Sequence, residues 1–145
     1  MFLISERILL TIWIGGMWVV GYVVAPVLFK MLERSVAGDV AGQLFTIMSY
    51  IGLVCGVLLL TGLVTEYMQT VYRQWRFWLL LGMLLIIVIG QFILQPMMAE
   101  LKSVGLVDAN VQLFARLHGV ASILFLLNSL AGLTLVISGT RLSQQ

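Results

Sequence analysis

The first long apolar segment of the chain reads Trp13-Ile-Gly-Gly-Met-Trp-Val-Val-Gly-Tyr-Val-Val-Ala-Pro26. It carries no charge, contains three glycines and ends at a proline. Lipid does not drive apolar helices together, so membrane helices contact one another through small residues that let them approach closely. The segment therefore predicts a membrane helix that packs closely against other helices.

The composition of the whole chain indicates that a bilayer, not water, surrounds most of it. Of the 145 residues, 61% are hydrophobic and 10% are charged, and the mean hydropathy is +1.11. A water-soluble domain is typically about 45–50% apolar and about 25% charged. The net charge of +2 comes without a basic run, so nucleic acid is not expected as a partner. The single cysteine, Cys55, allows no disulfide within the chain.

Four apolar runs are long enough to cross a bilayer, which takes about 20 apolar residues. These spans cover residues 8–29, 44–65, 77–97 and 114–137, with expected amphipathic connections at residues 30–43 and 98–113. The first run lacks the basic flank and cleavage site of a signal peptide, so it is interpreted as a retained helix. The prediction is an all-α membrane protein with one domain, residues 1–145, whose four transmembrane helices form a bundle.

The orientation of the chain depends on a small difference in charge. With four spans, both termini lie on the same side, and Lys and Arg divide equally between the two sides. Only the N-terminal amine favours the cytoplasmic side for the termini. The expected location is the cell inner membrane, crossed several times.

The two halves of the chain share a weak repeat. Asp39 and Asp108 each begin the pattern Asp-x3-Gln-Leu-Phe, and the preceding span ends near Pro26 or Pro96. Such a repeat predicts two similar helix hairpins of the same orientation, related by an axis along the membrane normal. Both aspartates would then be helix N-caps. The alternative is a chance match in a chain of biased composition.

Small residues recur at a spacing of four along the spans, as expected for helices that touch. The residues assigned to helix packing are Trp13, Gly16, Gly21, Ala25, Gly38, Gly42, Gly52, Gly56 and Gly119. Packing alone accounts for their pattern.

His118 is the only histidine and therefore the only histidine candidate for a metal ligand. On a helical wheel it shares a face with Ser122, Phe125, Ser129 and Gly132, and this face is expected to look into the bundle. Polar groups at membrane depth tend to be functional, which favours a ligand-binding or proton-handling role. In the structural alternative, a hydrogen bond to a loop carbonyl satisfies a histidine so near the helix start. One histidine excludes bis-histidine haem within one chain, whereas a single axial haem ligand or a haem shared across a dimer is not excluded.

Gln91 and Gln95 lie four residues apart, directly before Pro96. They are expected either to satisfy the carbonyl that the proline frees or to line a polar path. The residues predicted to line a ligand site are His118, Gln91, Gln95, Pro26 and Asp39. The sequence contains no nucleophile–base–acid set and no phosphate-binding loop, so catalysis by protein groups alone is not expected.

Three segments carry a family resemblance. They are Trp13-x-Gly-Gly-Met-Trp-x2-Gly-Tyr-x2-Ala-Pro26-x2-Phe29, Ala37-Gly38-x3-Gly42-x2-Phe45 and Leu117-His118-Gly119. The chain resembles bacterial four-span membrane proteins similar to transmembrane protein 205, which are grouped as a domain of unknown function. More distantly, its first span is similar to that of D-type copper-resistance proteins and membrane-bound protoporphyrinogen oxidase. The resemblance implies a four-helix protein of the inner membrane, and the distant relatives imply copper or haem handling.

The expected partner of the whole chain is the lipid bilayer, and three hypotheses for its function follow. In the first, the protein binds or passes a small ligand between its hairpins. In the second, it is a redox protein that handles haem or copper through His118. In the third, its glycine faces dock onto copies of itself, as a homo-oligomer, or onto a larger membrane complex.

Overall fold

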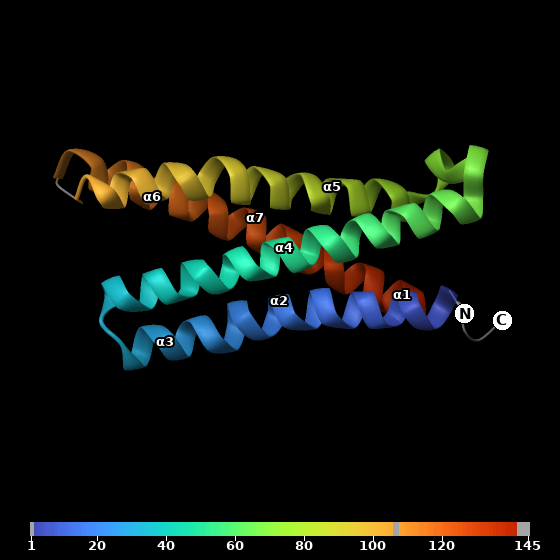
Figure 1. The fold of residues 1–145 in the computed structure, drawn as a ribbon, viewed down its shortest axis with the longest axis horizontal. Helices are drawn as coiled ribbons and strands as arrows, with labels where there is room; N and C mark the ends of the chain where they lie inside the picture. The colour runs from blue at the N-terminus through green and yellow to red at the C-terminus, as the bar shows by residue number, and fades with distance from the viewer. Residues whose placement is uncertain (1, 106–107, 142–145) are drawn as a thin grey trace.

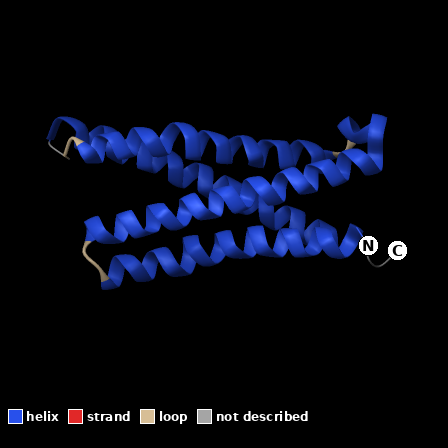
Figure 2. Ribbon diagram, viewed as in Figure 1, coloured by secondary structure: helices blue, strands red, loops and turns tan. Residues whose placement is uncertain are grey.

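The computed structural model describes residues 2–105 and 108–141. Four long helices run back and forth and form a bundle (Figure 1), and the described part of the chain contains helices and short connections without strands (Figure 2). Each of the four is long enough and apolar enough to cross a membrane. The predicted all-α four-helix membrane bundle is therefore confirmed.

The first long helix is continuous but not uniform. It consists of α1 (Phe2–Leu10), η1 (Thr11–Gly15), α2 (Gly16–Trp18), η2 (Val19–Val24) and α3 (Ala25–Met31). The backbone stays in the right-handed helical region at every join. The segments η1 and η2 are π-helical, so the helix is locally wider there.

The third long helix has the same construction next to its proline. It consists of α5 (Trp75–Ile89), the π-helical η4 (Gly90–Leu94) and α6 (Gln95–Ser103). In both helices a π-helical segment ends two residues before a proline, Pro26 or Pro96. A proline ring inside a helix crowds the carbonyl four residues earlier and offers no N–H to it. The wider π-helical turn accommodates this carbonyl without ending the helix.

The second and fourth helices are uninterrupted. They are α4 (Arg34–Tyr67) and α7 (Asp108–Arg141), each of 34 residues. A 3-10 helix, η3 (Met68–Arg73), connects α4 to α5. The predicted connections at residues 30–43 and 98–113 are mostly helical, because α4 begins already at Arg34 and α6 continues to Ser103.

Asp39 is not the N-cap of the second helix, so that prediction is wrong. The N-cap is Glu33, which has an extended backbone and makes no capping hydrogen bond with its side chain. Asp39 lies five residues after the start of α4, where its carboxylate pairs with Lys102. Asp108 is the first residue of α7, and its side chain lies outside the described part of the structure.

We call residues 2–67 the first hairpin and residues 75–141 the second hairpin. The start of α1 and the end of α7 lie with η3 at one end of the bundle, the termini end (Figure 1). The turn from α3 to α4, the end of α6 and the start of α7 lie at the opposite end, the connection end (Figure 1). At the termini end, Arg76 of the second hairpin donates to the Glu6 carboxylate of the first.

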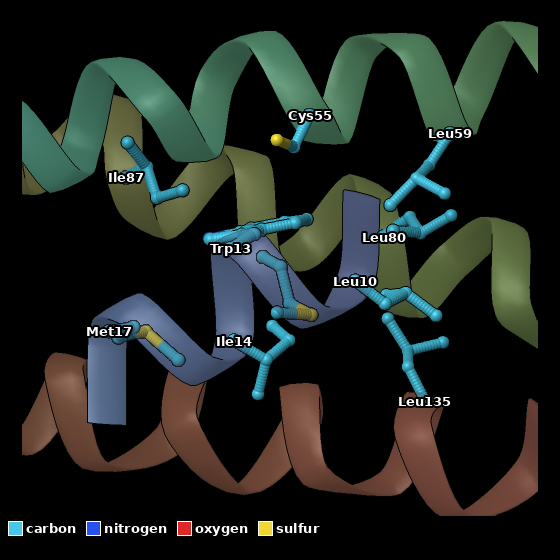
Figure 3. Close-up of a cluster of buried hydrophobic side chains, with 10 residues drawn as sticks. Leu10, Trp13, Ile14, Met17, Cys55, Leu59, Leu80, Ile87 and Leu135 are labelled. Carbon is cyan, nitrogen blue, oxygen red and sulfur yellow. The ribbon is translucent and has the colours of Figure 1, made fainter. Parts of the chain in front are cut away.

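The core of the bundle is built around Trp13, which is 1% exposed (Figure 3). Its indole lies against α4 where Gly52 and Gly56 leave room. A Cβ atom at Gly52 would be 2.6 Å from Trp13 Nε1, and one at Gly56 would be 3.2 Å from the indole. The residues packed in this cluster are Leu10, Trp13, Ile14, Met17, Cys55, Leu59, Leu80, Met83, Ile87 and Leu135. The Gly52-x3-Gly56 pair therefore accommodates an aromatic side chain.

Other glycines assigned to packing differ in their surroundings. A Cβ atom at Gly16 would be 2.6 Å from the Met48 methyl, and one at Gly21 would be 2.2 Å from the Phe125 ring. Ala25 is half-buried. Gly119 is exposed, and a Cβ atom there would meet open space, so this glycine lies outside the described helix contacts.

The outer surface of the bundle is apolar along its length. Large hydrophobic side chains from all four helices are more than half exposed, among them Val23, Val54, Leu85 and Ile123. In water such a surface would be costly, whereas in a bilayer it faces the lipid chains. The protein is a multi-pass membrane protein.

Candidate functional site

The five residues predicted to line a ligand site do not gather at one place. Pro26, Asp39 and His118 are exposed, whereas Gln91 and Gln95 are half-buried. Of these, Gln95 and Asp39 contact the opposite hairpin, and both contacts lie at the connection end.

Four side chains form what we call the connection-end clasp: Asp39 and Thr46 from α4, and Gln95 and Lys102 from α6. Gln95 Nε2 donates to the Gly42 carbonyl at 3.3 Å and to Thr46 Oγ1 at 3.2 Å. Lys102 Nζ donates to Asp39 Oδ1 at 2.9 Å. The clasp joins the second hairpin to the first through polar groups.

The glycines of the Gly38-x3-Gly42 pair lie directly beneath the clasp. A Cβ atom at Gly38 would be 3.7 Å from Lys102 Nζ, and one at Gly42 would be 3.7 Å from Gln95 Nε2. This pair therefore faces polar side chains, in contrast to the Gly52-x3-Gly56 pair.

His118 is linked to the clasp only through an aromatic ring. Lys102 Nζ lies 5.9 Å from the centre of the Phe114 ring, and that ring stacks on His118 with 6.2 Å between centroids and 8° between planes. The imidazole lies on the outer surface of α7.

The helix face that contains His118 looks into the bundle over only part of its length. His118 and Ser122 are exposed, Phe125 is half-buried, and Ser129 and Gly132 are buried. The expectation that the whole face looks inward is therefore wrong at its start. The reason is the oblique course of α7, which starts beside α6, crosses behind α4 and ends beside α1, so that the side of α7 that faces the bundle changes along its length (Figure 1).

Two further polar contacts join α7 to the first long helix, and we call the four residues that make them the interior polar cluster: Met17, Asn128 and Ser129, which are buried, and Tyr22, whose ring is partly exposed. The Tyr22 hydroxyl and Ser129 Oγ are 3.0 Å apart and share a hydrogen bond. Asn128 Nδ2 lies 3.8 Å from the Met17 sulfur as a donor. Ser129 is 0% exposed and Asn128 is 4% exposed.

The Asn128 side-chain carbonyl is the unusual feature of this cluster. Among the residues described, Asn128 Oδ1 is a buried side-chain oxygen without a hydrogen-bond partner. The Met17 sulfur is only an acceptor, so it attracts the amide nitrogen and turns Oδ1 away. Leaving a buried acceptor unpaired costs about 1–3 kcal/mol.

Aromatic rings connect the interior polar cluster with the bilayer. Trp18 and Tyr22 lie 5.3 Å apart, Tyr22 and Phe125 5.7 Å, and Phe125 and Phe45 5.4 Å between centroids. Trp18 and Tyr22 are 38% and 44% exposed on the outer surface, whereas Asn128 and Ser129 are buried. The cluster thus lies between the bundle interior and an aromatic, lipid-facing edge.

Sequence reasoning missed most of this cluster. It placed Ser129 on a packing face, assigned Asn128 no role and did not consider Tyr22 for the site. The available signal was the position of Asn128 near the middle of an apolar span, where a polar side chain is costly. Lys102 was missed as well, because its pairing with Asp39 depends on how the hairpins meet.

The described residues offer little for metal binding. Among them, no three His, Cys, Asp or Glu side chains come together as a metal-binding group. Met17, Met83 and Cys55 pack into the hydrophobic core. A shallow hollow on α4, lined by the apolar Leu53, Val54, Val57 and Leu58, faces outwards like the rest of the lipid-facing surface.

Comparison with known proteins places the chain in a family without naming an activity. No curated protein and no solved structure matches it. The specific resemblances to transmembrane protein 205, copper-resistance proteins and protoporphyrinogen oxidase therefore gain no support. Residues 8–106, which include all four clasp residues and, apart from the start of α1, the first three long helices, match the domain of unknown function DUF4149. The chain is therefore a member of the DUF4149 family.

Proposed function

We propose that this protein is an inner-membrane protein that binds a small, uncharged ligand between its two hairpins, at the interior polar cluster. The unpaired Asn128 Oδ1 is the observation that carries the proposal. A polar group inside a membrane bundle is costly and is commonly retained for function. A ligand that donates a hydrogen bond to Asn128 would remove the cost of the unpaired carbonyl.

The position of the cluster fits a site shared by both hairpins. Met17 and Tyr22 come from the first hairpin, and Asn128 and Ser129 come from the second. Tyr22 lies within the π-helical η2, and π-helical turns occur frequently at functional sites. Pro26 follows two residues after η2, so in this proposal it shapes the segment that positions Tyr22.

The other predicted site residues take supporting roles in this proposal. Gln95 and Asp39 hold the hairpins in register through the connection-end clasp. Gln91 lies in η4, the π-helical segment of the second hairpin. His118 stays outside the ligand site, because its side chain is exposed on α7.

The proposal also treats the two hairpins as copies of one repeat, with the termini in the cytoplasm. Each hairpin has a π-helical segment that ends two residues before a proline, followed by an uninterrupted helix of 34 residues. These shared structural features support the proposed repeat independently of the sequence pattern Asp-x3-Gln-Leu-Phe.

Native mass spectrometry of the protein purified in mild detergent tests the ligand. The wild-type protein is expected to carry a small molecule that the Asn128→Leu variant lacks. Thr134→Val is the matched control, because it removes an exposed hydroxyl of α7 that bonds only to its own helix at Leu130. Identical spectra for the wild type and Asn128→Leu would contradict the proposal.

A second candidate function is docking onto another membrane helix through the outer face of α7. Gly119 is exposed beside open space, and His118 and Ser122 are exposed on the same helix within a membrane span. With Cys55 replaced by alanine, Gly119→Cys is expected to cross-link to a neighbour in native membranes more readily than Val120→Cys. If neither the Gly119→Cys variant nor the Val120→Cys variant cross-links, and both stay monomeric, the result would argue against docking.

A further inference from the structure

We infer that the ligand of the interior polar cluster is a lipid-soluble molecule with a hydroxyl on an aromatic ring, a phenol or hydroquinol, that enters from the bilayer. The inference rests on the proposed function and adds the chemical class of the ligand and its route. The ligand class follows from the hydrogen-bond donors and acceptors of the cluster, and the route follows from Trp18 and Tyr22, which are exposed on the lipid-facing surface.

The cluster requires a ligand that donates a hydrogen bond. Asn128 Oδ1 is only an acceptor, and it is buried and unpaired within the described structure. The neighbours in the cluster are a thioether and two hydroxyls, so no carboxylate lies among the four residues. A neutral O–H donor therefore suits the site, whereas an ammonium ion would lose its hydration without gaining a counter-charge.

The same cluster also has a donor to offer. The hydrogen bond between Tyr22 and Ser129 uses one of their two O–H hydrogens, whichever residue donates. The other hydrogen is left for a further acceptor. Ser129 follows Asn128 on α7, and neighbouring side chains of a helix point in different directions, so the acceptor Oδ1 and the remaining O–H are two separate hydrogen-bonding capacities of the cluster.

The surroundings favour an aromatic ring next to that hydroxyl. Trp18, Tyr22, Phe125 and Phe45 form a chain of tilted and edge-on ring contacts. Aromatic side chains hold another ring in such offset or edge-to-face contacts. Trp18 and Tyr22 are also the members of this chain that are exposed on the lipid-facing surface. Asn128 Oδ1 is buried in this structure, so the hydroxyl of a ring resting on Trp18 and Tyr22 reaches it only when the side chains beside the carbonyl move apart.

Three probes of similar chain length separate the requirements: 2-decyl-1,4-hydroquinone, its oxidised quinone form, and 1-decanol. Each is added under nitrogen to the full-length protein in mild detergent, and the bound fraction is measured by equilibrium dialysis. The quinone oxygens accept but do not donate, so they leave Oδ1 unpaired. The hydroquinone is expected to bind at least about tenfold more tightly than the quinone. Decanol is expected to bind more weakly than the hydroquinone, because it lacks the ring.

Variants test whether binding occurs at the cluster. Asn128→Leu is expected to abolish the preference for hydroquinone over quinone, and Thr134→Val is expected to preserve it. Tyr22→Phe combined with Ser129→Ala removes both hydroxyls that could donate to the ligand, and the double variant is expected to weaken hydroquinone binding about fivefold.

The outcomes separate this inference from the proposed function. Equal binding of hydroquinone and quinone, or decanol binding as tightly as hydroquinone, would overturn the ligand class. If Asn128→Leu still loses the co-purified molecule in that case, the proposed site stands and only its assigned ligand is wrong. If neither the co-purified molecule nor the probes respond to Asn128→Leu, both proposals are wrong.

Discussion

Replacement of Gly52 by alanine is expected to destabilise the bundle, whereas the same replacement at Gly62 on the same helix is not. A methyl group at Gly52 would lie 2.6 Å from Trp13 Nε1 and 2.9 Å from Ile87 Cδ1. Trp13 is 1% exposed and Ile87 is 6% exposed, so neither side chain has free space beside it. Overpacking of this kind costs about 1–3 kcal/mol. At Gly62 no atom outside the local helix lies within 4 Å of the new methyl group.

The comparison isolates the steric cost. Both glycines lie inside α4, and each gains roughly 0.5–1 kcal/mol of helix stability on replacement by alanine. This gain cancels between the two variants, so Gly52→Ala is expected to be less stable than Gly62→Ala by about 1–3 kcal/mol. The measurement is equilibrium unfolding in mixed micelles with increasing fractions of dodecyl sulfate, followed by circular dichroism.

A double-mutant cycle with Trp13→Phe tests the assigned contact. The phenyl ring lacks the pyrrole edge that would meet the new methyl group, so Trp13→Phe is expected to recover part of the loss caused by Gly52→Ala. The coupling between the two replacements is expected to be about 0.5–3 kcal/mol. Equal stability of Gly52→Ala and Gly62→Ala would refute this account of the core, and strictly additive effects would refute the role of Trp13.

Three further predictions use the same unfolding assay. Gln95→Leu is expected to lower the free energy of unfolding by about 1–2 kcal/mol, because it removes the two hydrogen bonds that the Gln95 amide donates to α4, and unchanged stability would contradict the assigned bonds. Lys102→Asp alone or Asp39→Lys alone is expected to destabilise the protein at low salt by only about 0.2–1 kcal/mol, because the ion pair is partly exposed. The double variant exchanges the two charges and is expected to restore stability; a double variant that stays as unstable as the single variants would argue against the ion pair. Met68 has a φ of 41°, a backbone conformation that is strained for a residue with a side chain but not for glycine. Met68→Gly is therefore expected to stabilise the protein by roughly 1 kcal/mol, and unchanged or lower stability would contradict backbone strain at Met68.

The sequence predicted the number and kind of helices because bilayer insertion leaves a direct mark on composition. A backbone in lipid must satisfy its own hydrogen bonds, so four uncharged apolar runs imply four helices. The helix ends were less predictable, since apolar runs mark the hydrocarbon thickness and not the helix itself. The helix α4 begins at Arg34, before the apolar run, so Asp39 already lies in its second turn. Polar residues outside the hydrocarbon region can extend a helix in this way without leaving a mark on the apolar pattern.

The site was harder to predict, because a helical wheel gives faces but not the neighbours of each face. His118 and Ser129 share a face of α7, yet one is exposed and the other is 0% exposed, because α7 crosses the bundle obliquely. The unpaired state of Asn128 depends on which side chain of the first hairpin lies opposite, and that residue is Met17. The spacing of residues within one helix predicts neither the exposure of His118 nor the contact between Asn128 and Met17.

The two kinds of glycine contact have a consequence for the order in which the protein assembles. Trp13 against Gly52 is a contact within the first hairpin, so the two helices made first have an apolar seam of their own. The Gln95, Lys102 and Ser129 contacts all reach from the second hairpin to the first. The first hairpin can therefore pair as soon as its two helices are made, whereas Tyr22, Thr46 and Asp39 gain their hydrogen bonds to the second hairpin only after the later helices are inserted.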